Sequence, residues 1–293
     1  MGRPVSRYRL HSSAFERTDE TKKVNPKRMI ILSVEGDNTE RNYFQNLNRH
    51  LDDALIQIEI LRHRSGDGYC DPTHVIELLE EYLQVRQGGI IPPDLPPEFT
   101  QKYSPDFIQA FLDGDGSLPS EQRQDFQDDL MAIGINLEYR RYLQTFGQEG
   151  DYFAVVLDRD CGNHSKKLME QCSRHCEEQG YGFFLTNPCF EFWLLLHLCH
   201  VKEIFSPTEL ARLEENPRVS AHHTLVSQEV SSRAHHAKYI SSAKFDQCYL
   251  PNIQRAISQA GQFATSFPEL LEHMGSNLPV LFEILGWKPE RGI

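Results

Sequence analysis

Continuous apolar runs alternate with segments of helical periodicity over the first 200 residues. The strongest runs are Met29–Val34 and Tyr152–Leu157, and shorter ones cover Ile56–Leu61 and Phe183–Leu185. A run that is apolar throughout is typical of a strand buried on both faces, as in a parallel sheet. We therefore predict four strands at these positions.

A segment with helical spacing of apolar residues follows each strand. The helices are expected from near Glu40, over Pro72–Val85, over Ser165–Gln179 and over Phe190–His200. Asn38 or Thr39 is a candidate cap for the first of them. Strands that alternate with helices predict an α/β fold with a mostly parallel sheet.

Two stretches depart from this rhythm. Residues 88–120 are rich in Pro and Gly turn signals, and a helical segment is expected over 121–146, so 88–148 is interpreted as an insertion. Within it, Asp113–Gly116 is similar to the start of a calcium loop, but Gln124 stands where a bidentate Glu is needed, which argues against calcium. Residues 201–293 are expected to form helices joined by polar turns.

The charge of the chain limits its class. With 30 basic and 42 acidic residues the net charge is −12, which excludes a protein that coats duplex DNA without sequence preference. A nucleic-acid enzyme with a local basic groove, or with acids that hold metal ions, stays open. Residues 1–28 carry eight basic and three acidic residues. This arm is either a flexible, solvated tail or an electrostatic tether for a phosphate backbone.

The lengths of the apolar runs and the spacing of the cysteines indicate the compartment of the protein and the state of its thiols. No run reaches the roughly 18 apolar residues of a membrane helix, and no apolar signal segment opens the chain. Seven cysteines without a framework spacing favour free thiols in a reducing cytoplasm. Buried thiols are favoured over a zinc site in one cluster, because it has an apolar helical stripe and no CxxC pair: Cys161, His164, Cys172, His175 and Cys176.

Acidic residues follow two of the predicted strands. Glu35 comes after the first strand, and Asp158 and Asp160 come after the later one. In open parallel sheets, ligands bind beyond the carboxyl ends of the strands. Three converging carboxylates repel one another unless a divalent cation lies among them, and oxygen ligands favour Mg²⁺ or Mn²⁺. Such an ion can orient a phosphodiester. The alternative is that these acids cap the helices that follow.

The chain resembles a known family on these motifs. A strand ending in Glu-Gly and a later strand ending in Asp-x-Asp are similar to the Toprim domain of topoisomerases, primases and related nucleases. Glu35–Phe44, Leu157–Asp160 and Asn187–His197 resemble the RloB-like proteins of prokaryotic restriction and abortive-infection loci. The motifs lie within 29–200, whereas Asn277–Pro279 fits only loosely and the insertion departs from the compact pattern.

The resemblance implies a Toprim-like (Rossmann-like) domain over 29–200 and a Mg²⁺-dependent phosphodiesterase. Glu35 would be an acid/base or a metal ligand, and Asp158 and Asp160 would be metal ligands. It also implies an anti-phage effector, often encoded beside a separate ATPase of the ABC or overcoming-lysogenization type. Some Toprim effectors cut RNA, including tRNA, and others nick DNA, so the substrate stays open, as does assembly into a homo-oligomer.

Further residues are candidates for the site. Glu191 is the only charged residue from Phe190 to Val201 and is a catalytic candidate. A buried carboxylate needs a partner, which could be a backbone donor, Arg159 or the metal. His197 is interpreted as a hydrogen-bonded core histidine in preference to a proton shuttle. The candidates for substrate binding are Thr39, Asn42, Arg159 and Lys244.

Three functions compete at this point. The first is a metal-dependent nuclease in defence against phage. The second is a non-catalytic module that senses a nucleic acid or a phage protein and signals to an ATPase. The third is a nucleotide-handling phosphotransferase that uses the same acids.

Overall fold

The computed structural model describes residues 28–36, 38–52, 56–61, 71–87, 95, 97–112, 116–132, 150–160, 162–234 and 239–287. The predicted basic arm, apart from Arg28, lies outside these residues, as do Asp113–Asp115 and Cys161. The chain divides into two compact units. One comprises residues 24–61, 68–79 and 150–293, and the other comprises 1–23, 62–67 and 80–149.

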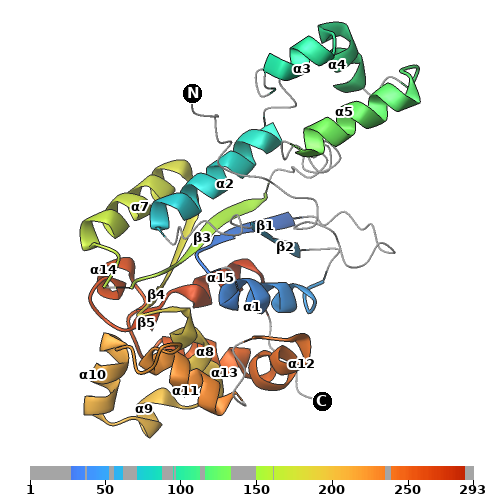
Figure 1. Cartoon of the computed structure of the whole chain (residues 1–293). Coiled ribbons are helices and arrows are strands. Elements are labelled where there is room, and N and C mark those ends of the chain that lie inside the picture. The colour runs from blue at the N-terminus through green and yellow to red at the C-terminus, as the bar shows by residue number, and fades with distance from the viewer. Residues whose placement is uncertain are drawn as a thin grey trace. The chain divides into compact units, whose positions relative to one another are not determined.

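The first unit is built on a five-stranded sheet of order β2-β1-β3-β4-β5 (Figure 1). Its strands are β1 (Arg28–Val34), β2 (Ile56–Leu61), β3 (Tyr152–Asp158), β4 (Gly182–Asn187) and β5 (Gly275–Ser276). The first four are parallel, and β5 is antiparallel to β4. The prediction of an α/β fold with a mostly parallel sheet is therefore confirmed.

Helices cover both faces of this sheet (Figure 1). One face carries α7 (Lys166–Gln179) and the start of α2 (Pro72–Gln87), and the other carries α1 (Thr39–Asn48), α8 (Phe190–Leu198) and α15 (Leu278–Ile284). Because both faces are covered, every residue of β1 after Arg28 is buried, which explains the continuous apolar run.

Local signals define α7 well. The Ser165 side chain accepts a hydrogen bond from the backbone N–H of Leu168, and Gly180 ends the helix in the left-handed conformation. Cys172 and Cys176 are buried on this helix, as the apolar stripe predicted.

The C-terminal residues of this unit form mainly short helices. They are α9 (Val201–Ile204), α10 (Pro207–Glu215), α11 (Leu225–Arg233), α12 (Ser242–Lys244), a π-helical turn (Phe245–Tyr249), a 3-10 turn (Leu250–Asn252), α13 (Ile253–Ala260) and α14 (Phe267–Leu270). Strand β5 also lies in this region, for which only helices were expected. These elements share one hydrophobic core with the sheet. In the described part of the chain, no helix has the length and apolar character needed to cross a membrane.

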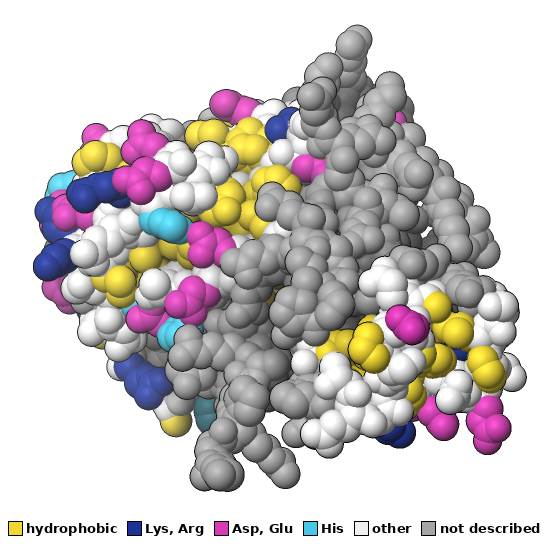
Figure 2. All heavy atoms as spheres, turned by 90° about the horizontal axis from the view of Figure 1, so that it is seen from above, with side chains coloured by type: hydrophobic (Ala, Val, Ile, Leu, Met, Phe, Trp, Pro, Cys, Tyr) yellow, Lys and Arg dark blue, Asp and Glu magenta, His cyan; other side chains and the backbone are white. Residues whose placement is uncertain are grey.

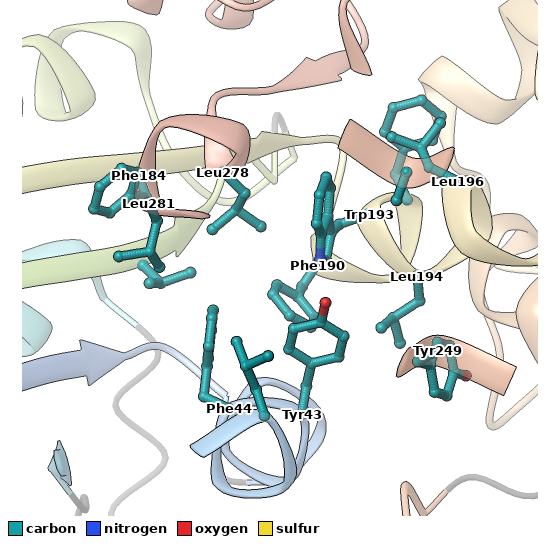
Figure 3. Packing of buried hydrophobic residues seen from close by; sticks show 14 of the residues in the cluster. Tyr43, Phe44, Phe184, Phe190, Trp193, Leu194, Leu196, Tyr249, Leu278 and Leu281 are labelled. Atoms are coloured by element: carbon teal, nitrogen blue, oxygen red, sulfur yellow. The ribbon is translucent and has the colours of Figure 1, made fainter. Parts of the chain in front are cut away.

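Helix α8 lies at the centre of this core (Figure 3). It is apolar on nearly all sides because it packs against the sheet, α11 and α13. The Tyr43 hydroxyl lies 3.0 Å from Nε2 of His197, whose Nδ1 lies 2.9 Å from the Trp193 carbonyl oxygen. A carbonyl can only accept, so Nδ1 donates to it, and Nε2 accepts from Tyr43. His197 is therefore a hydrogen-bonded core histidine, as predicted.

The second unit contains α3 (Pro97–Lys102), α4 (Pro105–Leu112) and α5 (Ser120–Ala132). Their apolar side chains form a separate small core. Turn chemistry was expected over 88–120, but α3 and α4 are helices that begin at Pro97 and Pro105. Proline fits the first position of a helix, where its missing N–H costs nothing. The helix expected over 121–146 is described only as α5, and 133–149 lie outside the described residues.

Candidate active site

The carboxyl ends of β1 and β3 are neighbours in the sheet. The chain places β2 on one side of β1 and then β3 on the other, so the direction of strand order reverses between β1 and β3. Such a reversal is the usual ligand-binding crevice of an open α/β sheet. Glu35 directly follows β1, and Asp158 is the last residue of β3. Glu35 and Asp158, both predicted from the sequence as site residues, thus lie at the point where the strand order reverses.

Hydrogen bonds hold these two acids together. The Glu35 N–H donates to the Val156 carbonyl oxygen at 3.1 Å, which continues the pairing of β1 with β3. The Asp158 N–H donates to Oε2 of Glu35 at 2.9 Å. Oδ1 of Asp158 accepts from the N–H of Phe190, the first residue of α8, at 2.8 Å. Asp158 therefore caps a helix, though this is α8 and not the helix that follows it in the chain.

Burial and mutual repulsion raise the pKa of both carboxyls. The Glu35 side chain is only 10 % exposed. Burial is the main cause that raises the pKa of Glu35 to about 8, the hydrogen bond from Asp158 opposes it, and the charges of Glu40, Asp160 and Asp71 add to it. Burial, followed by the charges of Glu40, Glu35 and Glu191, raises the pKa of Asp158 well above its usual value. We call the six residues the acidic cluster: Glu35, Glu40, Asp71, Asp158, Asp160 and Glu191.

Two members of the acidic cluster were not selected from the sequence. Glu40 is buried in the first turn of α1, and its carboxylate lies over Gly36, where a Cβ atom would be 2.0 Å from Oε2. Asp71 precedes α2, and its Oδ1 accepts from the N–H of Thr73 at 2.8 Å. The signal available for both was their position in the loop or first turn after a parallel strand.

A tight turn after β3 brings a histidine to Glu35. Asp160 has a positive φ of 28°, and its carbonyl oxygen accepts from the N–H groups of Asn163 and His164. Nε2 of His164 lies 3.8 Å from Oε1 of Glu35, and Nδ1 lies 3.3 Å from the Asp158 carbonyl oxygen. From the sequence, His164 is noted only as part of the cysteine and histidine cluster for which buried thiols are favoured over a zinc site.

Arg159 and Glu191 have partners of their own. The Arg159 guanidinium is buried and donates to the carbonyl oxygens of Leu271 at 3.0 Å and His164 at 2.7 Å. These bonds give Arg159 a structural role, and they do not pair it with Glu191. Burial is the main cause that raises the pKa of the Cys189 thiol, and the charge of Glu191 adds to it; the same charge acts on Asp158.

The other candidates for substrate binding lie on helices. Thr39 is the first residue of α1, and Asn42 is buried one turn later, where its carbonyl oxygen accepts from Nδ2 of Asn46 at 2.7 Å. The cap position of α1 is Asn38, whose side chain makes no capping hydrogen bond. Lys244 is buried on α12, and burial lowers its pKa.

The acidic cluster fits a hard divalent cation in the type of its donors. All of these donors are carboxylate oxygens, which Mg²⁺ and Mn²⁺ prefer, and a cation would offset the repulsion that opposes ionisation. The coordination shell is not preformed: no three His, Cys, Asp or Glu side chains in the described part of the chain are arranged to hold a metal. Figure 2 shows acidic side chains and histidines next to one another on one side of the surface.

Comparison with known proteins adds the family. The model of the RloB-like protein family matches residues 30–285, which include β1 from Ile30 onward, the other four strands and every member of the acidic cluster. No curated protein and no solved structure is significantly similar to the chain. Since the match covers most of its length, the chain belongs to the RloB-like family.

Proposed function

We propose that this protein is a metal-dependent nuclease that hydrolyses phosphodiester bonds in RNA or DNA with Mg²⁺ or Mn²⁺. One observation carries the proposal. Glu35 and Asp158 are hydrogen-bonded to each other where the strand order reverses, and further acids act on both through their charges.

The proposal assigns separate roles to the residues of the acidic cluster. Glu35, Asp158 and Asp160 would hold the ion, and Glu40 joins them because its charge acts on both Glu35 and Asp158. When bound, the ion would orient the phosphodiester and stabilise negative charge on its oxygens. Oδ1 of Asp158 and Oε2 of Glu35 each accept a backbone N–H, so these bonds fix the orientation of both carboxylates.

Glu191 is a candidate for proton transfer, and so is Glu35 as the alternative to its role as a metal ligand. A general acid or base works best when its pKa lies near the working pH, and the environment of Glu35 without a cation moves its pKa in that direction. Glu191 belongs to the same cluster, and its charge acts on Asp158.

Family membership supports the biological side of the proposal. Because the chain belongs to the RloB-like family, the proposal includes the anti-phage role and the separate ATPase partner that the resemblance implies. A non-catalytic sensor would need neither the ionised acids nor a cation, so the activity of acid variants separates the two functions.

A cleavage assay tests the proposal. The purified protein is incubated with tRNA, total RNA or DNA in Mg²⁺, in Mn²⁺ or in EDTA, and the ends of the products are sequenced. We expect metal-dependent cleavage that falls by at least about 100-fold in Glu35→Gln and in Asp158→Asn. Glu203→Gln is the matched control, since that side chain is 78 % exposed on α9. Cleavage at the wild-type rate in Glu35→Gln, with unchanged unfolding, would contradict the proposal.

A further inference from the structure

His164 has two distinct sets of contacts. Its backbone is held from one side, because Nη1 of Arg159 donates to its carbonyl oxygen at 2.7 Å while Nε of the same guanidinium donates to Leu271. Its imidazole is held from the other side, with Nδ1 3.3 Å from the Asp158 carbonyl oxygen. The side chain is 6 % exposed. The ring is thus fixed in place at the edge of the acidic cluster.

The orientation of the ring determines which atom faces Glu35. A carbonyl oxygen can only accept, so Nδ1 of His164 carries a proton and donates to the Asp158 carbonyl oxygen. Nε2 is then the atom directed at Oε1 of Glu35, at 3.8 Å. The other oxygen of that carboxylate, Oε2, accepts from the Asp158 N–H. The Glu35 carboxylate therefore accepts a backbone N–H on Oε2 and faces the buried imidazole with Oε1.

We propose that His164 is a positioning residue for Glu35. Arg159 anchors the turn, the turn directs the imidazole, and the imidazole limits rotation of the Glu35 carboxylate, so that its oxygens stay aligned for a cation. This inference rests on the proposed function, in which Glu35 is a metal ligand. Groups that orient a metal ligand contribute about 10- to 100-fold to metal affinity when they are tested by mutation.

Two variants of His164 separate positioning from simple packing. In His164→Asn the amide occupies the place of Nδ1, so it can still donate to the Asp158 carbonyl oxygen but no longer reaches Glu35. In His164→Gln the longer amide reaches the place of Nε2 and can still contact Glu35. The expected order of Mn²⁺ affinity is wild type, then Gln within a few-fold, then Asn at least about tenfold weaker.

The test measures Mn²⁺ binding by electron paramagnetic resonance and unfolding by urea in EDTA, on the full chain. Positioning predicts that affinity follows the reach toward Glu35, with similar unfolding midpoints in both variants. If Asn binds Mn²⁺ as the wild type does, or if affinity merely follows the unfolding midpoint, the role of His164 is overturned. If the wild type binds no Mn²⁺, the proposed function itself fails together with this inference.

Discussion

The buried His197 gives a stability prediction with a defined sign. Burial is the main cause that lowers the pKa of His197 to about 3, and the charge of Arg255 adds to it, while the bond to the Trp193 carbonyl oxygen opposes it. In the unfolded chain the pKa of a histidine is 6.5. Between these values the unfolded chain binds a proton that the folded protein does not. Folding therefore loses stability as the pH falls through this window.

The size of this effect follows from the two pKa values. A single proton contributes at most about 1.4 kcal/mol per pH unit, and integration from about pH 7.5 to about pH 5 gives a loss of about 2 kcal/mol. His197→Gln does not titrate, yet its amide can still accept from Tyr43. The wild type should be the more stable protein near pH 7.5, and its advantage over the variant should shrink by about 2 kcal/mol at about pH 5.

Urea unfolding of both proteins at several pH values in EDTA measures this difference. All other titrating groups are common to the two proteins, so the difference in unfolding free energy isolates His197. Two parallel curves of stability against pH would refute the reasoning, because His197 would then titrate normally in the folded protein and could not be a neutral core residue.

Replacing two glycines by alanine should have different effects: one variant should lose affinity for Mn²⁺, and the other should lose stability. In Gly36→Ala the new Cβ would meet the flexible end of Glu40, so Mn²⁺ affinity should fall about tenfold while unfolding changes by less than about 1 kcal/mol; unchanged affinity would separate Glu40 from the cation. In Gly275→Ala the Cβ would lie 2.0 Å from the Ala264 carbonyl oxygen, which is backbone, so urea unfolding should show a loss of about 2–3 kcal/mol, against little change in the control Gly261→Ala.

The sheet could be predicted because burial on both faces leaves a clear sequence pattern. The four parallel strands are apolar runs, and the predicted bounds of β2 are those of the structure. Strand β5 left no such pattern, since it consists only of Gly275 and Ser276, which pair with β4. The backbone of Ala264 packs closely against that glycine. Helices α3 and α4 were missed because their first residues are prolines, which also occur in turns.

Only the site residues that lie at the ends of strands could be predicted from the sequence. Glu35 and Asp158 meet because their strands are parallel neighbours. The partners of the Arg159 guanidinium could not be predicted, because they are the carbonyl oxygens of His164 and of Leu271, which lies far along the chain. His164 depends on the left-handed conformation of Asp160, which hydrophobic periodicity does not reveal.

Calorimetric titration with Mn²⁺ tests the central claim that Glu35 and Asp158 share one cation. The wild type and Glu203→Gln should bind the ion equally at this site, whereas Glu35→Gln and Asp158→Asn should each lose that binding while they keep the wild-type far-UV circular dichroism. Binding of the same strength in all four folded proteins would contradict the account.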